Sequence, residues 1–214
     1  MVNLGTTLED EDPVEARRLY LEASGRGNPR AMYRLGLMAR ATDPVEAAKW
    51  WERAAEVDYP NAQFQLGRYL AEIDPVRSGE LLTKAAKAGV VSAMALLGYN
   101  LMTKDEANAL YWLSRAHESG DTTAAYNLAV ISRRCNRPKA IGLVTPLAES
   151  GDRNSMLLLA VLLEEDDQTA QALSWFEKAA AAGDPRAKER LKWYESNRPS
   201  GWRAQLRRML RTRT

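Results

Sequence analysis

The stretch that decides the fold is KAAKAGVVSAMALLG, residues 84–98. It holds the small pair Ala85-Ala86, a glycine at position 89, an alanine four residues later and a Leu-Gly pair at 97 and 98. The same pattern recurs along most of the chain with a period of 31 residues, lengthened once to 32. An internal repeat of this length indicates a solenoid, in which similar helical units stack on one another.

Four columns of residues stay in register through six copies of the repeat. The glycine column is Gly27, Asp58, Gly89, Gly120, Gly151 and Gly183. An alanine column follows four residues later, at Ala31, Ala62, Ala93, Ala124, Ser155 and Ala187, and a leucine column four further on, at Leu35, Leu66, Leu97, Leu128, Leu159 and Leu191. A second small column precedes the glycine column by eleven residues, at Ala16, Ala47, Ser78, Ala109, Ala140 and Ala172. Such agreement is not expected by chance.

Each period predicts two helices, called here helix A and helix B, and no strand, because the apolar residues follow a 3.6-residue period. Helix A begins just after the glycine column. Helix B is announced three times by Asp-Pro-Val, at residues 12–14, 43–45 and 74–76, where Asp caps the helix and Pro occupies its first position. Helix B ends at the glycine column, where we expect a left-handed backbone, which Asp58 tolerates better than most residues would.

Small residues in both helices let two backbones approach closely, while large residues such as Trp50 and Trp51 fill the space beside them. One helix pair cannot bury these faces alone, so neighbouring pairs must stack. We therefore predict an all-α fold, an α-α superhelix: one right-handed solenoid of about six 31-residue helix pairs over residues 12–195. It would start with an unpaired helix B and end with an unpaired helix A. Residues 1–11 form an acidic segment that we expect to be disordered, and residues 196–214 a basic amphipathic segment.

Two segments carry a resemblance to a known family, AKWWERAA at 48–55 and WFEKAAAAG at 175–183. With the Leu-Gly pairs, they make the chain resemble the Sel-one-like repeat (SLR) family, a relative of the tetratricopeptide repeats (TPR), over roughly residues 12–195. The loop between helices A and B departs from the family, because it lacks the family's glycine-rich insertion. The resemblance implies a non-enzymatic bacterial adaptor, whose concave groove binds a protein or peptide.

Composition excludes several other classes. The net charge of +2 implies no bulk polyelectrolyte behaviour, and one Cys and one His cannot form an intrachain disulfide or a common zinc site. We see no secretory signal, no apolar run long enough for a membrane span and no nucleophile–base pair. We therefore expect a cytoplasmic protein with no cofactor and no catalytic site. The sequence leaves the partner's identity and the oligomeric state open.

The concave surface of a TPR-like superhelix is lined by helix A, and the Leu-Gly column gives the inward positions of each copy. They combine aromatic, amide and arginine side chains, the types from which interface anchors are made. The candidate partner-binding residues are Tyr33, Arg34, Leu37, Phe64, Gln65, Arg68, Tyr99, Tyr126, Asn127 and Val130, with Leu96, Leu157 and Val161 at equivalent places. The alternative is that some of them belong to the core between repeats.

The C-terminal segment carries six arginines after residue 195 and no acid, so residues 1–195 have a net charge of +2 − 6 = −4. Trp202, Leu206, Met209 and Leu210 would share one helical face, with Arg203, Arg207, Arg208 and Arg211 beside it. A basic amphipathic helix is typical of a membrane-surface or nucleic-acid element. The alternative is a cap on the last repeat with solvated arginines. We do not expect sequence-specific reading of nucleic acid.

Three smaller features are interpreted as structural. Pro146 lies inside a predicted helix B, near its end, where an irregularity is tolerated. Cys135 lies among three arginines, which would lower the pKa of a thiol, but it has no second Cys or His beside it. The loop EEDD at 164–167 holds four acids without the ligand spacing of a calcium site.

Overall fold

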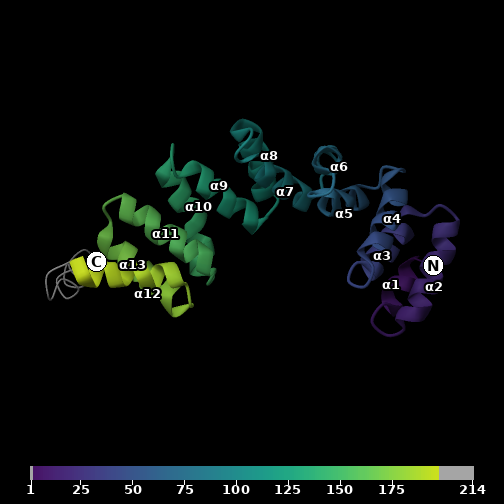
Figure 1. The fold of residues 1–214 in the computed structure, drawn as a ribbon, viewed down its shortest axis with the longest axis horizontal. Coiled ribbons are helices and arrows are strands. Elements are labelled where there is room, and N and C mark those ends of the chain that lie inside the picture. The colour runs from purple at the N-terminus through teal and green to yellow at the C-terminus, as the bar shows by residue number, and fades with distance from the viewer. Residues whose placement is uncertain (1, 198–214) are drawn as a thin grey trace. The chain divides into compact units, whose positions relative to one another are not determined.

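The computed structural model describes residues 2–197, and Figure 1 shows their arrangement as helices. The described residues form thirteen helices and no strand, so the predicted all-α, α-α class is confirmed. The chain divides between Ser119 and Gly120 into two compact units. That residues 12–195 form one continuous solenoid stays a prediction. The segment containing Arg203, Arg207, Arg208 and Arg211 lies outside the described residues.

Four helix pairs make up the first unit. They are α1 (Val2–Leu8) with α2 (Pro13–Gly25), α3 (Pro29–Ala39) with α4 (Pro44–Ala55), α5 (Pro60–Leu70) with α6 (Pro75–Lys87), and α7 (Val91–Leu101) with α8 (Glu106–Glu118). The second unit contains α9 (Thr122–Ser132), α10 (Arg137–Glu149), α11 (Arg153–Glu165), α12 (Thr169–Ala181) and α13 (Pro185–Asn197). From α3 onward the odd-numbered helices are the predicted A helices, the even-numbered ones are the predicted B helices, and α1 was not predicted.

The predicted helix ends are confirmed. The side chains of Asp12, Asp43 and Asp74 accept backbone N–H groups of the first turns of α2, α4 and α6, and a proline follows each of them. All six residues of the glycine column have positive φ, from 54° at Asp58 to 99° at Gly151. This left-handed backbone ends each B helix and turns the chain into the next A helix. α10 continues through Pro146 to Glu149, in agreement with a tolerated irregularity.

The predicted disorder of residues 1–11 is wrong, because residues 2–8 form α1 and pack on α2. A Cβ built on Gly5 would lie 2.7 Å from the ring of Tyr20, so only glycine permits this approach. The Tyr20 hydroxyl donates to Glu9 at 2.6 Å, and Tyr20 is fully buried. The signal was present in the sequence: Leu4-Gly5 precedes Leu35-Gly36 by one period of 31 residues. The chain therefore starts with a helix pair rather than with an unpaired helix B.

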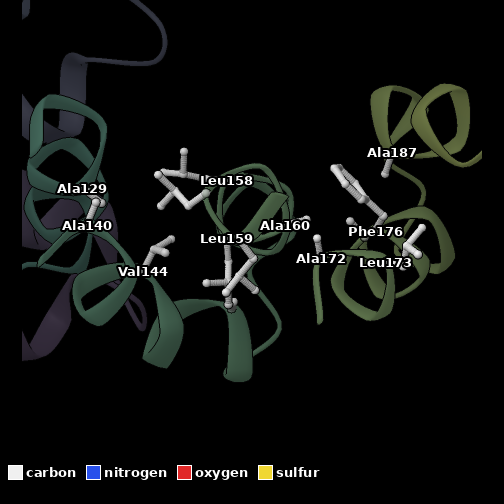
Figure 2. Packing of buried hydrophobic residues seen from close by; sticks show 14 of the residues in the cluster. Ala129, Ala140, Val144, Leu158, Leu159, Ala160, Ala172, Leu173, Phe176 and Ala187 are labelled. Atoms are coloured by element: carbon white, nitrogen blue, oxygen red, sulfur yellow. The ribbon is translucent and has the colours of Figure 1, made fainter. Parts of the chain in front are cut away.

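The same close approach recurs in each pair of the first unit. Gly36 faces the Trp51 indole, Gly67 faces Leu82 and Gly98 faces Leu113, each large residue lying fifteen positions after its glycine. In the second unit, Ala129 and Ala160 occupy the glycine position, and Val144 and Phe176 occupy the position of the opposing large residue. Figure 2 shows the core of this unit, in which Phe176 and Ala172 of α12 lie between Ala160 of α11 and Ala187 of α13.

Substitution of Gly36 by Ala tests the close approach. The added Cβ would overlap the Trp51 indole, which is itself buried, so Gly36→Ala should lower the free energy of unfolding by about 1–3 kcal/mol. The matched control is Gly142→Ala in α10, where an added Cβ meets nothing within 4 Å. Alanine there should raise stability by about 0.5–1 kcal/mol. Urea unfolding followed by circular dichroism measures both, and equal effects would contradict the packing argument.

Deletion of residues 1–8 tests the role of α1. A seven-residue helix does not form in isolation, so α1 depends on its packing against Tyr20. Its loss removes the partly buried Val2 and Leu8 and uncovers Tyr20, which should cost about 2 kcal/mol. Thr7→Ala, on the exposed face of the same helix, should change stability by less than about 0.5 kcal/mol. If the deletion leaves the thermal unfolding midpoint unchanged, α1 does not belong to the cooperative fold.

Candidate binding groove

A groove of about 1160 Å³ lies in the second unit. Its apolar floor is built by two A helices and one B helix: Tyr126 and Val130 of α9, Leu157, Leu158 and Val161 of α11, and Phe176 of α12. Tyr126 and Val130 are four residues apart and share one helix face, as do Leu157 and Val161 one period later. The repeat therefore places two equivalent apolar pairs beside each other. Partial burial raises the pKa of the Tyr126 hydroxyl.

The rim of the groove is strongly charged. Five arginines contribute to the lining, Arg133, Arg134, Arg137, Arg186 and Arg190, together with Glu164 and Glu165. The charged lining residues therefore sum to +5 − 2 = +3. Arg133 and Arg134 come from the α9–α10 connection, and Arg137 is the first residue of α10. Arg186 and Arg190 lie in the first two turns of α13, whereas both glutamates end α11.

Glu165 is held by two of these arginines. Arg133 donates from Nε to both carboxylate oxygens of Glu165 at 3.1 Å, and its terminal NH2 also donates to Oε1. Arg137 lies 3.7 Å from Glu165 and 3.7 Å from Asp166. The hydrogen bonds from Arg133 lower the pKa of Glu165 and raise that of the Arg133 guanidinium. Glu165 therefore stays ionised and fixes the positions of Arg133 and Arg137.

Glu164 is held by α13 in a similar way. Arg190 donates from Nε to its two oxygens at 2.9 and 3.1 Å, and the Tyr194 hydroxyl donates to Oε1. The Arg190 guanidinium also stacks 4.6 Å above the Trp193 ring. Hydrogen bonding to Glu164 raises the pKa of Arg190. These contacts tie the end of α11 to α13 and close one side of the groove.

Arg186 and Arg134 keep accessible guanidinium groups. Arg186 donates from NH2 to Asp184 at 3.0 Å, yet its side chain is 65% exposed, whereas that of Asp184 is 2% exposed. Asp184 also accepts the backbone N–H groups of Arg186 and Ala187, so it caps α13 and its pKa is lowered, first by the Arg186 side chain. Arg134 is exposed and makes no ion pair or hydrogen bond within residues 2–197.

The structure brings together only part of the predicted partner-binding set. Tyr126 and Val130 line the groove, together with Leu157 and Val161, which were expected at equivalent places. Asn127 is 7% exposed and lies in the interior of the unit rather than at the groove. Two adjacent residues of α9 therefore differ in their surroundings: Tyr126 lies at the groove and Asn127 lies in the core. A binding role for any of these residues stays a prediction.

The seven candidates of the first unit lie outside this groove and are mostly engaged in packing. Arg34 pairs with Glu9 at 3.1 Å, Tyr33 packs against the Tyr59 ring at 5.6 Å, and Leu37 packs on the core around Trp51. Gln65 is buried and accepts from Arg68, whose guanidinium lies 5.6 Å from the Phe64 ring. Tyr99 is 59% exposed.

The charged rim was missed by the sequence reasoning, which interpreted 133–137 as the surroundings of a cysteine and 164–167 as a solvated loop. The period contained a signal: Glu164 and Glu165 follow Arg133 and Arg134 by 31 residues. Residues one period apart lie side by side when repeats stack, so opposite charges at that spacing indicate a cross-repeat ion pair. Cys135 is exposed between two rim arginines.

Other kinds of site were also sought. Within the described residues, no three His, Cys, Asp or Glu side chains are grouped so that they could hold a metal ion. None of the helices that the structure describes is long and apolar enough to span a membrane.

Comparisons with solved structures support the fold. A crystal structure of c5321, a protective antigen of uropathogenic Escherichia coli with an SLR fold, matches with a TM-score of 0.81 at 20% identity, over 98% of this chain and 51% of that one. The chain thus spans about half the length of that protein. A Sel1 repeat protein from Oxalobacter formigenes matches with a TM-score of 0.71 at 25% identity, over 100% of both chains. YrrB, described as a TPR protein with an unusual peptide-binding site, matches with a TM-score of 0.63 at 18% identity, over 81% of this chain and 97% of that one.

The comparison with curated proteins finds no match. The family model of the Sel1 repeat matches residues 4–28, 29–59, 60–90, 91–121 and 155–184, which is most of the chain. Its first match includes α1, in agreement with the packing of Gly5 on Tyr20. It leaves out residues 122–154, which contain Arg133, Arg134 and Arg137 of the groove rim. The predicted resemblance is confirmed: the chain belongs to the Sel1 repeat family.

Proposed function

We propose that this protein is a non-enzymatic interaction scaffold that binds a peptide segment of a partner protein in the groove of its second unit. The role as an interaction scaffold is supported by the fold, because Sel1 and TPR-like repeats are the architecture of protein-interaction scaffolds. The binding of a peptide in this groove is supported by one observation: an arginine rim surrounds a continuous apolar floor, formed by Tyr126, Val130, Leu157 and Val161.

The dimensions and chemistry of the groove favour a peptide over a small molecule. Its volume of about 1160 Å³ exceeds the range of about 300–1,000 Å³ that is typical of small-molecule pockets. Its composition, an aromatic and aliphatic centre with arginine at the edge, is that of a protein interface. YrrB offers a structural precedent for peptide binding on a related fold. A cytoplasmic location, a bacterial source and a membrane role of the C-terminal segment stay predictions.

Selection of peptides tests this proposal. Peptides from a phage-displayed random library, selected on the full-length protein, should bind Leu157→Asp at least tenfold more weakly, because a carboxylate in the apolar floor loses its hydration on binding. Tyr126→Ala is a milder second variant that removes one aromatic anchor. The control is Val76→Asp, which changes a valine that is 75% exposed on the first unit. Fluorescence anisotropy measures affinity, and thermal unfolding verifies that each variant is folded.

The proposal is overturned if the selected peptides bind wild type and both groove variants with the same affinity. Weaker binding by Val76→Asp alone would place the binding surface on the first unit instead.

A further inference from the structure

We propose that the groove selects an acidic amphipathic segment, in which Asp or Glu side chains flank large aliphatic side chains. This inference rests on the proposed function and adds the chemistry of the partner. The aliphatic side chains would bind the floor formed by Val130, Leu157 and Val161, and the carboxylates would bind the rim at Arg134 and Arg186.

The side chains that line the groove have an excess of positive charge. Five arginines face two glutamates around the groove, and both glutamates are already bound within the protein. Glu165 is held by Arg133 and Arg137, and Glu164 by Arg190 and the Tyr194 hydroxyl. Asp166 and Asp184, outside the lining, pair with Arg137 and Arg186. Arg134 is therefore the rim arginine that has no acidic partner in the described chain. A partner with carboxylates complements this rim, and one with lysine or arginine is repelled.

Two arginines of the rim are accessible to a ligand. Arg134 is exposed and makes no contact with an acid in the described chain, and the Arg186 side chain is 65% exposed. Arg186 binds Asp184 through Nε and NH2, so its remaining terminal nitrogen is free to donate. Arg134 belongs to the α9–α10 connection and Arg186 to the start of α13, so a ligand on the floor meets a cation from each of these elements. A planar guanidinium binds a carboxylate through two parallel hydrogen bonds.

Two other occupants fit less well. The chain's own C-terminal segment has six arginines after residue 195 and no acid, so its charge has the same sign as the rim. Single-stranded nucleic acid needs aromatic side chains on which its bases stack. The floor offers only Tyr126 and the buried Phe176 among aliphatic side chains, so it gives bases little aromatic surface on which to stack.

Three labelled peptides of equal length test the proposal on the full-length protein. The acidic probe is Glu-Leu-Leu-Glu-Glu-Leu-Leu-Glu-Glu-Leu, and Gln or Lys replaces every Glu in the neutral and basic probes. Fluorescence anisotropy should give an affinity for the acidic probe at least tenfold above that for the neutral probe, with no competition by the basic probe. Raising the salt concentration should reduce this difference, because exposed charge pairs are screened.

Charge-reversed variants identify the residues. Arg134→Glu should weaken binding of the acidic probe about tenfold and leave binding of the neutral probe unchanged. Arg186→Gln should also weaken binding of the acidic probe. Gln is used at this position because a glutamate would repel Asp184, which caps α13. The control is Arg153→Glu, an exposed first residue of α11 outside the groove, with the same change in net charge. Arg134 is exposed and makes no ion pair or hydrogen bond within residues 2–197, so its variant should stay folded, which thermal unfolding verifies.

The single cysteine of the chain locates the bound probe. Cys135 is exposed beside Arg134, so the acidic probe carrying an N-terminal chloroacetyl group should alkylate its thiol, displacing chloride and forming a thioether. The neutral probe with the same group should react at least tenfold more slowly, and Cys135→Ser should not react.

The outcomes separate this inference from the proposed function. If the affinity of every probe falls in Leu157→Asp but does not change with Arg134→Glu or with the charge of the probe, the groove binds peptides and the acidic preference is wrong. If Leu157→Asp binds the acidic probe as wild type does, both are wrong. Absence of binding by the acidic probe overturns the inference, and so does tighter binding of a single-stranded oligonucleotide that Arg134→Glu abolishes.

Discussion

The structure depends on the close approach of the two helices in each repeat, where a backbone lies against a large side chain. In the first unit this contact is made four times, by glycines that face Tyr20, Trp51, Leu82 and Leu113. A methyl group at any of these glycines would come within about 3 Å of the opposing side chain, a spacing that packed interiors do not tolerate. The same contact fixes the rotation of helix A about its axis. It therefore decides which side chains face the core and which face outward.

The helix pair α9 and α10, whose α9 contributes to the groove, packs with different residues at these two positions. Ala129 replaces the glycine, and Val144 replaces the larger residue opposite it, so the summed volume is roughly kept. The family model leaves out this copy, residues 122–154. This copy differs in sequence from the other repeats, yet its two helices pack as theirs do. The residues by which it differs are therefore available for binding. Arg134 and Arg137 are such differences.

Electrostatics adds to packing at this end of the chain. The period places Glu164 and Glu165 one repeat after Arg133 and Arg134, but the pair that forms is the diagonal one, Arg133 with Glu165. Glu164 is instead bound by Arg190 and Tyr194 of α13. Such half-exposed pairs add little to stability individually. Their effect is to hold the rim side chains in fixed positions, which lowers the entropy lost on binding.

The sequence by itself determined the period, the helix pairs, their caps and the left-handed residues, because these depend on local backbone chemistry repeated in register. It also contained the first helix, through Leu4-Gly5, although acidic composition suggested disorder. Only the tertiary structure decided which of the inward positions are accessible. Tyr126 lines the groove whereas its neighbour Asn127 is buried, and Arg34 is bound by Glu9. Adjacent helical residues differ by about 100° in direction, so a small rotation set by packing moves a side chain from the surface to the core.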